Sequence, residues 1–141
     1  MTPTARAEKS AAAMLSGDRA SAWLGMSIEH VDEGTASLTL TVADHHANGH
    51  GICHGGIIFA LADSAFAFAC NSRNQKVVAQ HNTITFIAPA QVGDRLVATA
   101  REVSLSGRSG IYDVSVTTGD GVAIAEFRGC SRTLRGTLFE E

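Results

Sequence analysis

One carboxylate stands alone in the most apolar segment of the chain. Asp63 is the only charged residue between His54 and Arg73, and 12 of the 14 residues from Ile57 to Cys70 are apolar. Burying a carboxylate costs several kcal/mol unless it is compensated, and desolvation raises its pKa toward the range of a general base. Asp63 is therefore a candidate catalytic group. The alternatives are a structural hydrogen bond that Asp63 accepts from Ser64 or from a neighbouring strand, and exposure at an interface.

The loop before this apolar segment is the second candidate for chemistry. Four of the nine residues from Asn48 to Gly56 are glycines, which allow the backbone to approach a ligand closely. A helix that begins near Gly55 has N–H groups without intrahelical partners, and its dipole favours negative charge there. Such a helix start can stabilise the oxyanion that develops from a carbonyl group. The alternative is a glycine-rich loop with an ordinary helix start.

The spacing of these two candidates predicts how a site would be assembled. Gly55 and Asp63 are eight residues apart, which is ~12 Å of rise along one helix. An oxyanion donor and a catalytic carboxylate must both lie about 3 Å from one reacting atom. Two antiparallel copies of the helix can satisfy this condition, whereas one copy cannot easily do so. We therefore expect a site formed by two subunits across a twofold axis.

Two other chemistries are conceivable in the same loop. The histidines of this region are closely spaced: His45, His46, His50 and His54. Their spacing would align three of them on a helix, but the intervening glycines disfavour one, and neither an HExxH motif nor a cysteine pair accompanies them. No native metal site is therefore expected. Cys53 is a candidate thiol nucleophile, although its neighbour His54 should point away from it.

The elements that must position these groups follow from periodicity and turn residues. The first 24 residues are Ala-rich and indicate one or two short helices, broken at Ser16-Gly17-Asp18. Residues 35–42 alternate as a half-buried strand, and Met26–Val31 is expected to pair with it. The glycine- and histidine-rich loop 43–56 leads into a helix over 55–70. Four more strands follow with short connections, which imply antiparallel pairing: Val77–Ala88, Arg95–Leu105, Gly110–Thr118 and Val122–Thr133.

The apolar helix determines the expected architecture. A helix that is apolar nearly all round must be buried on most sides, and its five alanines allow a curved sheet to approach closely. We therefore predict an α+β fold, with an antiparallel β-sheet wrapped around a central apolar α-helix. A single domain is expected over residues 1–141, with an N-terminal helical segment (1–24) and a core (25–135).

Composition excludes several classes of function. The chain has 141 residues and a net charge of −3, which argues against nucleic acid and against a polybasic membrane contact. Its charged fraction of 18% is low for a small domain and suggests surface hidden in an oligomer. Three cysteines make a poor disulfide framework, and the first 15 residues lack the apolar region of a secretory signal. We therefore expect a cytoplasmic protein that does not enter a membrane.

These residues carry a resemblance that covers about residues 22–133. The sequence resembles the hotdog-fold acyl-CoA thioesterases, specifically the phenylacetic-acid-degradation (PaaI-like) branch. The motifs that carry the resemblance are Asn48, His54-Gly55-Gly56, Leu61-Ala62-Asp63-Ser64, Cys70-Asn71-Ser72, Ala79-Gln80-His81, Phe86-Ile87-Ala88-Pro89-Ala90, Gly93-Asp94-Arg95-Leu96, Gly107-Arg108, Tyr112-Asp113-Val114 and Phe127-Arg128-Gly129.

The resemblance implies a hotdog fold and hydrolysis of an acyl-CoA thioester without a metal or a separate cofactor, since CoA is part of the substrate. By position, the Gly55 N–H would bind the thioester carbonyl, and Asp63 of the other subunit would act as nucleophile or general base. Asn48 would position water or the carbonyl, His54 would support the loop or contact the thioester, and Ser64 would assist Asp63. The resemblance places CoA at Asn82, Thr83, Gly107, Arg108 and Ser109.

The resemblance also implies an assembly and a substrate class. The family's usual state is a homotetramer built from dimers, with the active sites at the dimer interface. Its branch suggests aryl thioesters such as phenylacetyl-CoA and its hydroxylated relatives. Two alternatives use the same fold: a hydratase or dehydratase of acyl thioesters, which would need His54 as a proton shuttle opposite an acid, and a non-catalytic acyl-CoA binding protein.

Overall fold

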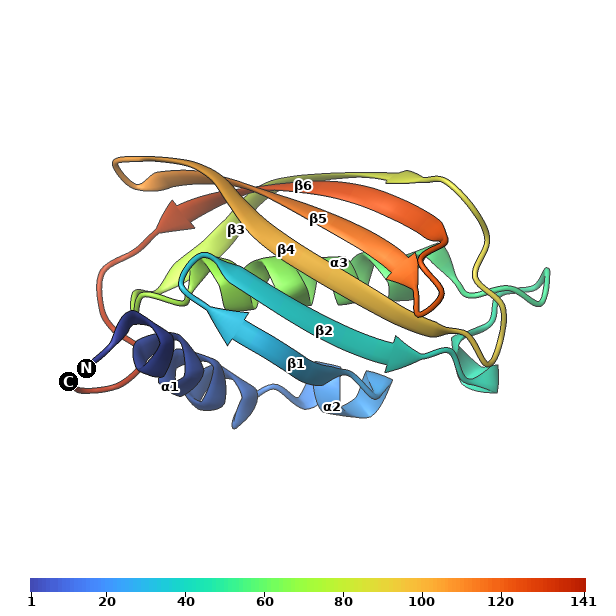
Figure 1. The fold of residues 1–141 in the computed structure, drawn as a ribbon, viewed down its shortest axis with the longest axis horizontal. Helices are drawn as coiled ribbons and strands as arrows, with labels where there is room; N and C mark the ends of the chain where they lie inside the picture. The colour runs from blue at the N-terminus through green and yellow to red at the C-terminus, as the bar shows by residue number, and fades with distance from the viewer.

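The computed structural model describes all 141 residues, and it begins with two short helices (Figure 1). Helix α1 (Pro3–Leu15) has a proline in its first turn, and the Thr2 hydroxyl caps it by accepting a hydrogen bond from the Ala5 N–H. Helix α2 (Arg19–Leu24) is capped by Asp18 and ends at Gly25, whose φ of 87° suits glycine. The predicted break between two N-terminal helices is confirmed.

The remaining elements are six strands, one turn of 3-10 helix and one long helix. In chain order they are β1 (Ser27–Asp32), β2 (Thr35–Thr41), η1 (Asp44–His46), α3 (Gly55–Cys70), β3 (Val77–Phe86), β4 (Arg95–Ser106), β5 (Ser109–Thr118) and β6 (Ala123–Thr133). The strands form one sheet in the order β1-β2-β4-β5-β6-β3, and every pairing is antiparallel. The predicted strands are confirmed to within two residues at each end, whereas η1 interrupts a segment that we expected to be loop throughout.

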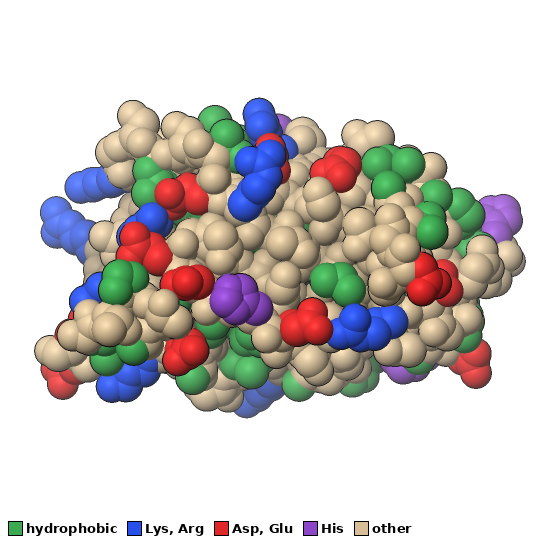
Figure 2. Space-filling view, in the orientation of Figure 1, with side chains coloured by type: hydrophobic (Ala, Val, Ile, Leu, Met, Phe, Trp, Pro, Cys, Tyr) green, Lys and Arg blue, Asp and Glu red, His purple; other side chains and the backbone are tan.

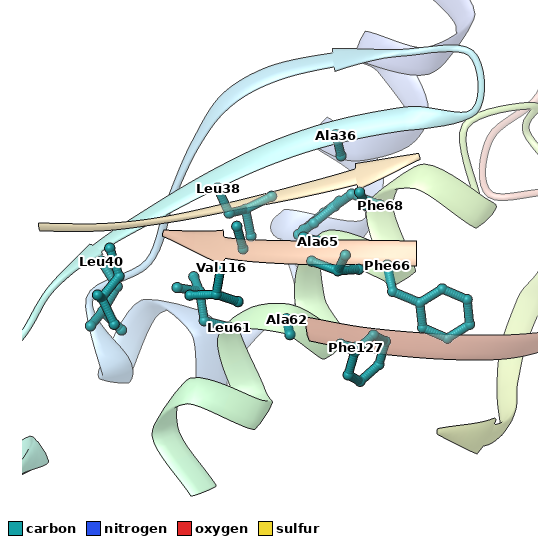
Figure 3. Packing of buried hydrophobic residues seen from close by; sticks show 14 of the residues in the cluster. Ala36, Leu38, Leu40, Leu61, Ala62, Ala65, Phe66, Phe68, Val116 and Phe127 are labelled. Atoms are coloured by element: carbon teal, nitrogen blue, oxygen red, sulfur yellow. The ribbon is translucent and has the colours of Figure 1, made fainter. Parts of the chain in front are cut away.

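Helix α3 lies against the concave face of the sheet, which curves around it (Figure 1). The alternating residues of β2 point toward this helix and are buried, as are those of the central strands β4 and β5. Figure 3 shows Leu61, Ala62, Ala65 and Phe66 of α3 meeting side chains of the sheet, among them Phe127 of β6. The predicted α+β fold, a sheet wrapped around a central apolar helix, is therefore confirmed.

The small residues of the core allow aromatic rings to lie directly on the sheet backbone. A Cβ atom added at Gly129 of β6 would lie 2.8 Å from three ring carbons of Phe66, a distance that side chains do not adopt. Phe66 is 1% exposed, so its ring has little room to move away. Gly129 is thus required by the close packing of helix and sheet rather than by its backbone angles.

We expect Gly129→Ala to lower the free energy of unfolding by about 1–3 kcal/mol, because the added methyl group overpacks the core. Denaturant unfolding at one fixed protein concentration measures this change. Gly119→Ala is the matched control, since the nearest atom to its new Cβ would be 4.0 Å away. Equal stability of the two variants would show that Phe66 can shift at little cost.

The two edges of the sheet differ in what covers them. Edge strand β1 lies beside α1 and α2, and the Thr4 hydroxyl of α1 donates a 3.0 Å hydrogen bond to Asp32 (Figure 1). Edge strand β3 pairs with β6 alone, so one side of its ten residues has no strand partner. Val78 and Phe86 of β3 are 45% and 51% exposed. An open edge with exposed apolar side chains is a template for pairing with another strand.

None of the helices combines the length and the apolar character that crossing a bilayer requires.

Candidate active site

Asp63 lies near the middle of α3 and is half-buried, on the side of the helix that carries Ala60 and Ala67. Its Oδ1 accepts a 2.9 Å hydrogen bond from Nδ2 of Asn82 on strand β3. Burial raises the pKa of Asp63, and the hydrogen bond from Asn82 partly opposes that rise. The structural alternative, a hydrogen bond from a neighbouring strand, is thus met by Asn82, and no hydrogen bond joins Asp63 to Ser64.

Asn82 reaches Asp63 because of an irregularity in β3. The pairing of β3 with β6 shifts between Ala79 and His81, so Gln80 is an extra residue in the strand. A bulge of this kind changes which side chains face the core. After it, Asn82 and Ile84 turn toward α3, whereas Thr83 is exposed. The Asn82 Oδ1 atom is buried and has no hydrogen-bond partner, so it remains free to accept a hydrogen bond from another group.

The start of α3 leaves one backbone donor free. His54 is the N-cap residue, and its Nδ1 accepts a 2.8 Å hydrogen bond from the Gly56 N–H. The His54 carbonyl oxygen accepts from the Ile57 N–H at 2.9 Å. Gly55 is the first helical residue, and its N–H makes no backbone hydrogen bond. His54 therefore supports the loop, and the N–H of Gly55 is left as the donor at the positive end of the helix dipole.

Asn48 holds the loop that precedes this helix. Its Oδ1 accepts hydrogen bonds from the N–H groups of His50 and Ile52, at 2.9 and 3.4 Å. Asn48 and Gly55 line the same cavity, which has a volume of about 450 Å³ and mainly apolar walls that include Phe86. A Cβ atom at Gly55 would lie 3.0 Å from the ring of Phe86, which is half exposed. Gly55 and Asn48 thus line one cavity, whereas the roles that the resemblance implies for them remain predictions.

Asp63 and Ser64 do not line that cavity. They line a second one of about 310 Å³, between α3 and the N-terminal helices, and the two cavities share no residue. One copy of the chain therefore keeps the free N–H of Gly55 and the carboxylate of Asp63 apart, in agreement with the ~12 Å rise expected between them.

The residues proposed for CoA are spread over two parts of the sheet. Thr83 is exposed on β3. Gly107 and Arg108 form the exposed turn between β4 and β5, where Gly107 has a φ of 60°, and Ser109 is the exposed first residue of β5. Asn82 lies instead against Asp63, a contact that its assignment to CoA did not anticipate. That Asn82, Thr83 and the turn contact CoA remains a prediction.

Most arginines of the sheet are paired with carboxylates. Asp113 of β5 accepts hydrogen bonds from Arg101 and Arg128 on the neighbouring strands, the shortest at 2.7 Å. Arg73 binds Glu102 at 2.6 Å. Accordingly, acidic and basic side chains are interspersed over the outer face of the sheet and form no large area of one sign (Figure 2). Arg108 and Arg132 make no ion pair, and their backbones meet at the same end of the sheet.

The rival chemistries of the loop find little support. Cys53 is buried, and burial raises its pKa to about 11, whereas a nucleophilic thiol needs a lowered pKa. His46 is buried, and its Nδ1 accepts a 2.9 Å hydrogen bond from the Ala43 N–H, so it closes the turn η1. No three His, Cys, Asp or Glu side chains converge as metal ligands. A hydratase would need a histidine opposite the acid, and the Nδ1 atom of His54 is already occupied by the Gly56 N–H.

Comparison with known proteins identifies relatives of this chain. A model of the thioesterase superfamily matches residues 50–125. The acyl-coenzyme A thioesterase PaaI of Escherichia coli is 41% identical over 136 residues, which cover 96% of this chain and 97% of that protein. Human acyl-coenzyme A thioesterase 13 is 30% identical over 98 residues, which cover 67% of this chain and 70% of that protein.

Two solved structures have the same fold as this chain. The E. coli PaaI protein, from the phenylacetic acid degradation operon, matches with a TM-score of 0.94 and 40% identity, covering 96% of this chain and 99% of that one. An Asn-to-Asp mutant of the phenylacetic acid degradation protein PaaI from Thermus thermophilus matches with a TM-score of 0.80 and 38% identity, covering 83% of this chain and 100% of that one. The chain belongs to the thioesterase superfamily, among its PaaI-like acyl-CoA thioesterases with the hotdog fold.

Proposed function

We propose that this protein hydrolyses an aryl-type acyl-CoA thioester to the free acid and CoA, with Asp63 as the reacting carboxylate. The observation that carries the proposal is a half-buried carboxylate in an apolar helix, with its pKa raised by burial and one oxygen held by Asn82. A carboxylate with a raised pKa is a stronger general base than an ordinary one. A thiolate leaves readily, so the reaction requires a mobilised oxygen nucleophile and a stabilised oxyanion.

The oxyanion donor in this proposal is the N–H of Gly55. It is the donor that His54 leaves free at the start of α3, and it opens into a cavity shared with Asn48. As the tetrahedral intermediate forms, the carbonyl oxygen gains negative charge next to this N–H and the helix dipole. When the intermediate collapses, the C–S bond breaks and CoA leaves as the thiolate. Asn48 would then hold the loop in the geometry that aims the donor.

In this proposal, Asp63 and Gly55 of two copies meet through the open edge of β3. Antiparallel pairing of β3 with β3 of a second copy would continue the sheet and place the two α3 helices side by side in opposite directions. The start of one helix would then face the middle of the other, which supports active sites made by two subunits. A tetramer built from two such dimers is the expected assembly, and sedimentation equilibrium tests it.

The proposal also covers the acyl group and the residues that contact CoA. Two matched structures are named for phenylacetic acid degradation, which supports an aryl acyl group.

Arg108 is exposed and free of carboxylate partners, so it is available to a CoA phosphate, whereas Arg128 is paired with Asp113. Gly107 and Ser109 would shape the turn around that contact, and Asn82 and Thr83 would face the CoA moiety from β3. Ser64 lines the same cavity as Asp63 and would assist it.

The test is release of CoA from a panel of aryl- and alkyl-CoA thioesters of matched size. We expect turnover, with aryl thioesters hydrolysed faster than straight-chain ones. Comparable rates for both would refute the aryl preference alone. Binding of acyl-CoA without turnover would refute the hydrolase and favour a binding protein.

A single turnover in heavy-oxygen water separates the two possible roles of Asp63, nucleophile and general base. Label that enters Asp63 first shows attack by the carboxylate, and label in the product alone shows activated water.

Asn82 acts in this proposal as a positioning residue for Asp63. Its amide hydrogen bond favours the ionised carboxylate, so its loss in Asn82→Ala raises the pKa of Asp63 further. The acid limb of the pH profile of kcat/KM should therefore move to higher pH, since Asp63 must be ionised to act. Thr85→Ala, on the exposed face of β3, is the control that should leave the limb in place. An unchanged limb in Asn82→Ala would mean that Asn82 does not tune the acid.

A further inference from the structure

The cavity beside Asp63 has a roof made by the N-terminal helical segment. Its floor is the outward side of α3, where Ala60 and Ala67 leave space, together with Phe68. Met14 of α1 and Leu24 of α2 lie opposite this floor. The volume of about 310 Å³ is at the lower end of the range for small-molecule sites, about 300–1,000 Å³. The N-terminal helical segment thus lines a cavity in addition to covering the edge of the sheet.

The position of Asp63 determines what such a cavity would receive. Asp63 lines it, so an acyl-CoA whose carbonyl carbon lies against this carboxylate has its acyl group at the mouth of the cavity. The CoA part leads away on the other side of the thioester bond. The small floor residues and the apolar roof then suit a compact, uncharged acyl group.

The charge of the cavity adds a second constraint. Asp18 also lines it, and both oxygens of its carboxylate accept hydrogen bonds from Ser21, at 2.9 Å from the N–H and 2.6 Å from the hydroxyl. No Lys, Arg or His is among the residues that line the cavity. Two carboxylates without a cation disfavour a third negative charge, and the partly enclosed site screens that repulsion less than open water does.

We propose that the cavity between α3 and the N-terminal helical segment holds the far end of the acyl group, and that Asp18 makes it select uncharged acyl groups over those that end in a carboxylate. This inference rests on the proposed thioesterase function, since it assigns specificity within the same site. It names residues of the N-terminal segment, Asp18 above all, as determinants of the substrate.

The first test removes the charge of Asp18 and keeps its structural role. Asn caps helices about as well as Asp, so Asp18→Asn should still accept the hydrogen bond from the Ser21 N–H. The substrates are hexanoyl-CoA and the CoA monothioester of the six-carbon dicarboxylic acid. We expect wild type to prefer the uncharged acyl group, and Asp18→Asn to reduce that preference about tenfold by raising kcat/KM for the charged one.

Asp120→Asn is the matched control, because it changes the net charge equally in the exposed turn between β5 and β6. It should leave the preference as in wild type. An unchanged preference in Asp18→Asn, or an equal change in both variants, overturns the role of Asp18.

The second test fills the cavity from its exposed side. Ala20 of α2 lines the cavity and is itself exposed, so Ala20→Trp adds bulk there with little effect on the core. We expect kcat/KM for phenylacetyl-CoA to fall at least tenfold relative to acetyl-CoA, whose acyl group does not reach the roof. Ala22→Trp is the control, as Ala22 is exposed on the same helix outside the cavity. Parallel behaviour of the two variants overturns the assignment of the cavity.

The outcomes separate this inference from the function on which it rests. If wild type hydrolyses no thioester of the panel, the proposed function fails and the inference fails with it. If hydrolysis depends on Asp63 while Asp18→Asn and Ala20→Trp leave the acyl preferences of wild type intact, the function stands and the inference alone is overturned.

Discussion

Asp63→Asn should lower kcat/KM for thioester hydrolysis by about 10³-fold or more, because an amide can neither attack the carbonyl nor accept a proton from water. The substitution keeps the size of the side chain and its contact with Asn82. Release of CoA under identical conditions for both proteins measures the loss. The thiol assay must be corrected for Cys53, Cys70 and Cys130.

The same variant should not lose stability. Burial raises the pKa of Asp63 in the folded protein above its unfolded value, so folding favours the protonated form. The ionised carboxylate therefore opposes folding above that raised pKa, and the favourable form is present only at lower pH. Asp63→Asn should accordingly unfold at an equal or higher denaturant concentration than wild type at pH 7. Lower stability, or activity near that of wild type, would contradict the assignment of Asp63 as a buried catalytic carboxylate.

The second large effect is expected at Gly55. Gly55→Pro removes the N–H that we assign to the oxyanion, and the first helical position is the one that tolerates proline best. His54 already has the extended backbone, φ −60° and ψ 134°, that a following proline requires. Gly55→Ala is the matched control, since it keeps the N–H and adds a Cβ near the ring of Phe86, which is half exposed and has room to shift.

We expect Gly55→Pro to lower kcat by about 10²–10³-fold relative to Gly55→Ala, which is the usual cost of losing one oxyanion donor. Steady-state hydrolysis at saturating substrate, which reports kcat, measures the difference. Equal rates for the two variants would assign the oxyanion to another donor.

Mixing the two inactive proteins tests the shared site directly. A dimer of one Asp63→Asn chain and one Gly55→Pro chain has one site with both defects and one site with none. Random reassortment makes half of the dimers mixed, so about a quarter of wild-type activity should return after the two variants are unfolded and refolded together. Co-refolding that restores no activity, although mixed dimers form, would show that each site is built within one chain.

Local patterns in the sequence were sufficient for the elements and for the two candidate groups. Strand alternation, the turn residues and the apolar run around Asp63 are short-range signals, and they predicted the strands, α3 and the α+β architecture. An isolated charge in an apolar helix stands out without any knowledge of its neighbours. The eight-residue spacing from Gly55 to Asp63 also predicted that one copy keeps the two groups apart, which the separate cavities bear out.

Contacts between distant residues were decided only by the tertiary structure. Asn82 lies 19 residues from Asp63 and reaches it because Gln80 bulges from β3, and a bulge leaves no periodic signal in the sequence. The cavity roofed by residues 14–26 likewise depends on where α1 and α2 pack, since an Ala-rich helix does not specify its partner. Periodicity shows which face of an element is buried, whereas the neighbour that buries it is selected by packing and hydrogen bonding in three dimensions.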